Sequence, residues 1–121
     1  MPTKANPITR HEPGPRMSQA VIHNGTVYLA GVVAEGANVT EQTTKILADI
    51  DRLLALSGSS KARLLSAQIF LSDISTFAEM NKVWDAWVDP ANPPARATVE
   101  ARLAARQFVV EIMVIAAQGE G

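Results

Sequence analysis

The chain of 121 residues is 47% hydrophobic and 19% charged, which is typical of a single globular domain with its own buried core. Its net charge of -1 excludes an overall positive field that would draw nucleic acid or anionic lipid to the surface. The sequence has no cysteine, which excludes disulfides, thiolate nucleophiles and cysteine metal sites, and its histidines, His11 and His23, are too far apart in the chain to predict a metal site.

Residues 1–16 hold four prolines and several polar residues, and we expect them to form an extended arm within a single domain of residues 1–121. This arm has no apolar core of the kind that a secretory signal carries. The apolar runs of the chain are far shorter than the roughly 20 residues that a membrane helix needs. These features favour a soluble, cytoplasmic protein.

The segment 18–33, SQAVIHNGTVYLAGVV, predicts a β-hairpin. Two apolar runs flank Asn24-Gly25, a dipeptide that tolerates the positive backbone angles of a tight turn. The residues that follow, AEGANV, are typical of a loop.

The segment 40–58, TEQTTKILADIDRLLALSG, predicts a helix. Thr40 has the residue type of an N-cap, and Gly58 stands where a left-handed residue ends a helix. One apolar stripe runs along this helix and consists of Ile46, Leu47, Ile50, Leu53 and Leu54.

A strand and a second helix follow. The segment 61–73 predicts a strand with one apolar face, made of Leu65, Ala67, Ile69 and Leu71. The segment 75–90 predicts a helix in which Thr76 and Glu79 have the spacing of a capping box. Phe77, Met80, Trp84 and Trp87 share a face of this helix, with Asn81 beside it, and we interpret both tryptophans as core or rim residues.

Two strands end the chain. In the first, residues 97–103, apolar residues alternate with Thr98, Glu100 and Arg102. The second, residues 107–117, is apolar on both faces except for Glu111. Because a short connection joins them, these strands are candidates for an antiparallel hairpin.

The elements give the order ββαβαββ, which predicts an α+β fold with a mixed sheet and two helices on one face. The last strand needs cover on its other face as well, and the sequence predicts no third helix. Because a bare apolar sheet face is unfavourable in water, we expect another copy of the chain to cover it.

Glu111 lies on the face that we assign to this subunit contact. A buried carboxylate takes up a proton or finds a cation, and Arg96 stands at the start of the preceding strand. Two readings stay open at this point. The pair could be structural and hold an oligomer together, or Arg96 could grip a carboxylate or phosphate while Glu111 orients water.

Several motifs in order resemble the RidA/YjgF family of enamine/imine deaminases, also labelled endoribonuclease L-PSP-like. They are PPARATVEARL with VVEIMVIA, VYLAG, EQTTKILADIDRLLALSGSS and IFLSDISTFAEMNKVWDAW, and the resemblance covers roughly residues 16–117. It implies a chorismate-mutase-like fold and a homotrimer with three clefts between subunits.

The resemblance also implies roles for individual residues. Arg96, in the Pro-Ala-Arg motif, would hold the substrate carboxylate, and Glu111 would help to position the attacking water. Asn81 and Thr98 would be supporting groups, Thr98 standing where cysteine is common, and the backbone near Gly31 would lie along the same cleft.

The sequence departs from the family pattern at three positions. Counting places Met17 where many members have a pocket tyrosine, so a thioether replaces a hydroxyl. Ala30 and Val32 replace polar residues of a Ser-Gly-Gln sequence. We therefore expect a more apolar pocket.

The first functional hypothesis is hydrolysis of 2-aminoacrylate-like enamines or imines to 2-keto acids and ammonia. It requires no metal or cofactor, because a protonated imine is already electrophilic. The second is a trimer that binds small carboxylates without turnover. The third, RNA cleavage or translation inhibition, has less support because the sequence lacks a basic stripe and a histidine pair, and we expect neither a nucleic-acid nor a membrane partner.

Overall fold

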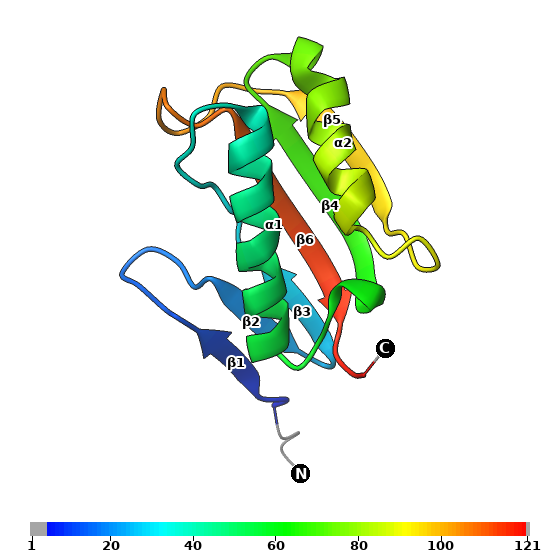
Figure 1. Cartoon of the computed structure of the whole chain (residues 1–121). Helices are drawn as coiled ribbons and strands as arrows, with labels where there is room; N and C mark the ends of the chain where they lie inside the picture. Colours follow the sequence, from blue (N-terminus) through cyan, green and yellow to red (C-terminus); the bar gives the residue numbers. More distant parts are fainter. Residues whose placement is uncertain (1–4, 121) are drawn as a thin grey trace.

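The computed structural model describes residues 5–120, which form one mixed six-stranded sheet with both helices on the same face (Figure 1). The two helices and the mixed sheet confirm the predicted α+β class. The strands are β1 (Ile8–His11), β2 (Ala20–His23), β3 (Thr26–Leu29), β4 (Leu64–Leu71), β5 (Ala95–Glu100) and β6 (Val110–Ala117). The helices are α1 (Val39–Leu56) and α2 (Phe77–Trp87), and short 3-10 helices span Lys61–Arg63 and Ile74–Thr76.

The strand order is β1-β2-β3-β6-β4-β5, so the last strand in the sequence lies in the middle of the sheet. Neighbouring strands are antiparallel except for β4 and β5, which are parallel and connected through α2. Within residues 5–120, no helix combines the length and hydrophobicity that a membrane crossing requires.

The N-terminal segment is more ordered than an extended arm. Residues 8–11 form β1, which pairs antiparallel with β2 from Ile8 opposite His23 to His11 opposite Ala20. The arm predicted over residues 1–16 is therefore extended at Ile8–His11 but is paired into the sheet there, while residues 1–4 lie outside the described part. Pro7 and Pro13 flank β1, which itself contains no proline and can donate its backbone N–H groups as an edge strand.

The predicted hairpin at Asn24-Gly25 is confirmed. β2 and β3 pair antiparallel, with His23 opposite Thr26 across the two-residue turn. Asn24 and Gly25 have φ angles of 51° and 76°, the positive values that a tight turn of this hand needs.

The predicted hairpin between the last two strands is wrong. β5 lies outside β4 in parallel, and β6 pairs antiparallel with both β3 and β4. The crossover through α2 returns the chain parallel to β4, and the segment 101–109 then carries it back to the centre of the sheet. A central position suits β6 because its side chains are apolar on both faces.

The first helix begins at a different cap from the predicted one. Asn38 is the N-cap of α1, and its side-chain oxygen accepts a hydrogen bond from the Glu41 N–H at 2.9 Å. Thr40 instead donates its N–H and hydroxyl to a carboxylate oxygen of Glu79. The predicted capping box between Thr76 and Glu79 is absent for that reason, and Glu79 links α2 to α1.

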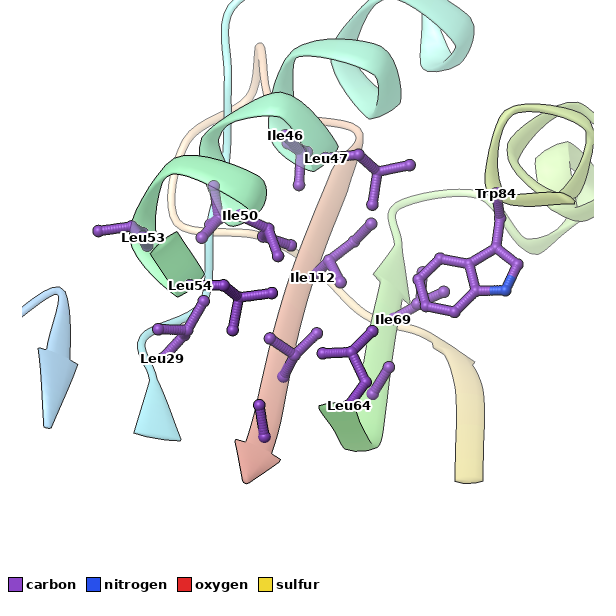
Figure 2. Close-up of a cluster of buried hydrophobic side chains, with 14 of the residues drawn as sticks. Leu29, Ile46, Leu47, Ile50, Leu53, Leu54, Leu64, Ile69, Trp84 and Ile112 are labelled. Carbon is purple, nitrogen blue, oxygen red and sulfur yellow. The ribbon is translucent and has the colours of Figure 1, made fainter. Parts of the chain in front are cut away.

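The core lies between the helices and one face of the sheet (Figure 2). The apolar stripe of α1, including Ile46, Ile50 and Leu54, points toward Ile112 of β6. In β4 the buried face agrees with the prediction at Ala67, Ile69 and Leu71. It differs at Leu65, which is exposed because a bulge places it between the paired residues Leu64 and Ser66.

Gln42 is a buried polar residue that joins α1 to the chain before β6. Its amide nitrogen donates to the carbonyl oxygens of Gly36 and Gln107, and its amide oxygen accepts from the Val109 N–H at 2.9 Å. The adjacent Thr43 is also buried, but its hydroxyl has no partner among the described residues. Two neighbouring buried polar groups therefore differ in hydrogen-bond satisfaction.

This difference predicts that removing the Gln42 amide lowers the unfolding free energy much more than removing the Thr43 hydroxyl. Gln42→Leu leaves two backbone carbonyls and one backbone N–H without partners, so we expect a loss of about 3 kcal/mol of unfolding free energy. Thr43→Val, the matched control, removes an unpaired hydroxyl and should change stability by less than about 0.5 kcal/mol or increase it. Urea denaturation at one fixed protein concentration measures both, and equal losses would contradict the assignment.

Candidate functional site

Arg96 lies on β5 and faces the helices. It pairs with Ala67 of β4, whose side chain is buried under the helices. The guanidinium carbon lies 5.3 Å from the ring centroid of Trp84 and 5.7 Å from that of Phe77, both on α2. β5 thus alternates as predicted, but its polar side, not its apolar side, is turned toward a helix.

Two more of the predicted site residues, Thr98 and Asn81, lie on the same pair of elements. Thr98 follows Arg96 on the same face of β5, opposite Ile69 of β4. Asn81 lies one turn after Phe77 on α2. The hydroxyl oxygen of Thr98 and the amide oxygen of Asn81 are both buried, and neither has a hydrogen-bond partner within residues 5–120. Unpaired buried oxygens next to a half-buried guanidinium are typical of a site that a polar ligand or water completes.

The tryptophans of α2 differ in environment. Trp84 is 5% exposed and belongs to the core, while Trp87 is half-buried at the rim and donates its indole N–H to Asp51 at 2.9 Å. The sequence interpretation as core and rim is confirmed. The contact of Trp84 with Arg96 is an additional role that helical spacing alone did not indicate.

Glu111 lies on the opposite face of the sheet, which the helices leave uncovered. It is half-buried on β6, opposite Phe70 of β4, which in turn pairs with Val99 of β5. The same open face holds Met113 and Ile115, as the sequence predicts. Within the described residues, neither Arg96 nor Glu111 forms a salt bridge.

Gly31 lies directly against Glu111. A side chain at position 31 would run into the Glu111 carboxyl group, with its Cβ 2.9 Å from the carboxyl carbon. The backbone bulges here: Tyr28 pairs with Ile115, but Ile112 pairs with Val32 instead of Gly31. The structure therefore brings Gly31 and Glu111 together, and a glycine provides the space for the carboxylate.

A single chain holds the predicted site residues in separate places. Arg96, Thr98 and Asn81 lie between β5 and α2, whereas Glu111 and Gly31 lie on the open face of the sheet. Met17 is 49% exposed in the segment between β1 and β2, at the sheet edge farthest from β5. An arrangement that joins these groups requires more than one copy of the chain.

An open hollow of about 750 Å3 lies at the far end of β5 from Arg96. It is lined by Ser72, Phe108 and residues 100–106, and by none of the predicted site residues. Within residues 5–120, no group of three or more histidine, cysteine, aspartate or glutamate side chains is placed to hold a metal ion.

A family model described as "Endoribonuclease L-PSP" matches residues 8–118. The chain belongs to this family. The predicted RidA/YjgF resemblance is confirmed by this match together with a solved structure of a YjgF family member that is 47% identical to this chain.

The similarity extends over nearly the whole chain. A RutC family protein of Haemophilus influenzae is 49% identical over 112 residues, which cover 90% of this chain and 97% of that protein. The crystal structure of NMB1025, a YjgF family member from Neisseria meningitidis, superposes with a TM-score of 0.92 at 47% identity and covers 95% of this chain and 98% of that one. A putative translation initiation inhibitor from Salmonella typhimurium has a TM-score of 0.83 at 46% identity, with coverage of 91% and 96%.

The three departures from the RidA/YjgF pattern have different environments. Met17 is exposed, and its carbonyl accepts a hydrogen bond from the Gly14 N–H. Ala30 is half-buried, and its N–H donates to the carbonyl of Gln19. Val32 is 4% exposed and lies in the core, so an apolar residue there fits the packing under the helices.

The contact between Gly31 and Glu111 predicts a specific coupling. Gly31→Ala should lower the unfolding free energy by about 1 kcal/mol, because the Glu111 side chain must rotate away from the new Cβ. In a Glu111→Ala background, the same substitution should cost less than half as much.

Gly14→Ala is the matched control, since its added Cβ would find only the Met17 carbonyl oxygen at 3.6 Å. It should change stability by less than about 0.5 kcal/mol. A Gly31→Ala cost that is equal with and without the Glu111 side chain would show that the contact does not determine the glycine.

Proposed function

We propose that this protein is a homotrimeric hydrolase that deaminates reactive enamine and imine acids to 2-keto acids and ammonia. The observation that carries the proposal is Arg96, a half-buried guanidinium held against aromatic rings without an acidic partner among the described residues. Membership of the RidA/YjgF family supports the same reading.

The surroundings of Arg96 favour a carboxylate ligand. Aromatic rings interact with the flat faces of a guanidinium and leave the N–H groups in its plane free to donate. These in-plane donors match the two oxygens of a carboxylate in a two-pronged grip. Since Arg96 has neither a salt bridge nor a side-chain hydrogen bond within residues 5–120, its donors remain for a ligand.

The open face of the sheet supports self-association. It carries Tyr28 and Val99, which are 44% and 47% exposed, together with the half-buried Met113 and Ile115. Apolar surface of this kind is stabilised by about 25 cal/mol for each Å2 that association removes from water. Glu111 lies within this surface, and a copy that packs there through its edge strand β5 would bring its own Arg96 toward Glu111.

The proposed reaction uses these groups in sequence. Arg96 holds the carboxylate, and Asn81 and Thr98 support the bound acid. Glu111 accepts a proton from a water molecule whose oxygen adds to the imine carbon, while the C=N electron pair moves to nitrogen. Glu111 then returns its proton to nitrogen, and the C–N bond breaks as the new hydroxyl becomes the carbonyl and gives its proton to Glu111. Ammonia leaves with the bonding electron pair and takes up that proton as ammonium. The protonated imine is electrophilic enough for this step without a metal or cofactor.

A trimer that binds carboxylates without turnover is the second candidate. The observation that favours it is the loss of polar groups at Met17 and Ala30, which leaves fewer side chains to move protons. RNA cleavage has less support. His11 and His23 stand at opposite ends of the β1–β2 ladder, three residue pairs apart, which is too far for paired acid and base catalysis on one phosphodiester.

The proposal predicts that Arg96→Ala lowers kcat/KM for 2-aminoacrylate hydrolysis by about 100-fold or more, because substrate positioning is lost. A pyridoxal-phosphate lyase generates the substrate, and its disappearance is followed with and without this protein. Arg102→Ala, which removes an exposed arginine, is the control and should keep wild-type activity. Light scattering should report a trimer for the wild type and both variants.

Three outcomes would contradict the proposed enzyme. A monomeric wild type would remove the shared cleft. No acceleration combined with calorimetric binding of 2-keto acids would favour the binding trimer. Salt-dependent RNA binding that survives Arg96→Ala would favour a nucleic-acid function.

A further inference from the structure

Two aromatic rings of α2 lie within cation–π distance of the Arg96 guanidinium. Phe77, Asn81 and Trp84 occur at positions i, i+4 and i+7 of α2 and therefore share one face. The guanidinium carbon is 5.7 Å from the centroid of the Phe77 ring and 5.3 Å from that of the Trp84 ring, so both rings lie within cation–π distance of the same group.

We infer that Phe77 and Trp84 are positioning residues that fix the orientation of the Arg96 guanidinium for carboxylate binding. This inference rests on the proposed function, in which Arg96 grips the substrate. An arginine on a flexible side chain loses conformational freedom when it binds a ligand, and a guanidinium already held in contact with two rings loses less. The rings supply this restraint without using the N–H donors that the ligand needs.

We call Phe77 and Trp84 the clamp of Arg96. Of the two residues, Trp84 is the one that is firmly anchored in the fold. Trp84 packs against Trp87 with ring centroids 5.3 Å apart. The indole N–H of Trp87 donates to Asp51 of α1, and the Lys61 ammonium lies 5.4 Å from the centroid of its ring. The position of Trp84 is thereby tied to α1 as well as to α2.

The other residue of the clamp is more accessible. Phe77 is 40% exposed at the first turn of α2, directly after the short 3-10 helix Ile74–Thr76. The Ile74 N–H donates to a carboxylate oxygen of Glu100 at 3.0 Å, which connects this turn to the end of β5. Phe77 is thus held near Arg96 by its own strand–helix connection, and its exposure makes it replaceable without opening the core.

Asn81 lies between Phe77 and Trp84 on the same face of α2. Its amide oxygen is buried and has no partner within the described residues, so it does not occupy the Arg96 donors. The clamp therefore restrains the guanidinium and leaves its N–H groups free to donate hydrogen bonds to a carboxylate ligand.

The test compares an aromatic and an aliphatic residue at position 77. Phe77→Leu keeps an apolar side chain but removes the ring, and we expect it to weaken 2-oxobutanoate binding in calorimetry by about fivefold. Phe77→Tyr keeps the ring and should restore affinity to within about twofold of wild type. Ile74→Ala, which alters a neighbouring exposed apolar residue outside the clamp, should bind like wild type.

A second readout does not depend on binding. The rings should shift the Arg96 side-chain N–H resonances upfield in the ligand-free protein, and Phe77→Leu should reduce that shift while Phe77→Tyr retains it. If the wild type binds no 2-keto acid but this pattern holds, the proposed function fails and the clamp stands. Wild-type affinity and an unchanged Arg96 resonance in Phe77→Leu would overturn the inference, and so would equal weakening by Leu and Tyr.

Discussion

β6 is apolar on both faces, but the two helices of this chain cover only one of them. The hydrophobic effect stabilises the covered face and leaves the other with partly exposed apolar side chains around Glu111. The proposed site depends on this open face, because Glu111 lies on it. A second copy is the proposed cover, since it would bury the apolar surface and supply the cation that a sequestered carboxylate needs.

Arg96 and Glu111 belong to opposite faces of one sheet, so within a chain they are not the structural ion pair that their residue types allow. The Arg96 guanidinium instead lies against aromatic rings, which attract a cation but do not neutralise its charge. That distinction has a functional consequence: an arginine already paired with a carboxylate has little affinity left for a second one. Gly31 similarly gives Glu111 room without giving it a hydrogen-bond partner.

Local signals in the sequence predict the parts of the fold that local physics determines. Asn24-Gly25 specifies the β2–β3 turn, and apolar periodicity specifies both helices. Strand β1 could not be predicted because three of its four residues, Thr9, Arg10 and His11, are polar, and pairing with β2 makes it a strand. The parallel pairing of β5 with β4 likewise depends on tertiary contacts that the local sequence does not specify. Residue types indicate Arg96 and Glu111 as candidates, but they do not predict the contact of Arg96 with Phe77 and Trp84, because aromatics at helical spacing are typical of a core.

The most direct measurement of the shared cleft mixes two inactive variants, Arg96→Ala and Glu111→Ala, after mild dissociation and reassembly. If Arg96 of one copy works with Glu111 of another, random mixing in equal amounts restores both side chains to about a quarter of the sites. Hydrolysis of 2-aminoacrylate should then return to about a quarter of the wild-type rate. Mixed assemblies confirmed by native mass spectrometry that stay as inactive as the separate variants would contradict the account.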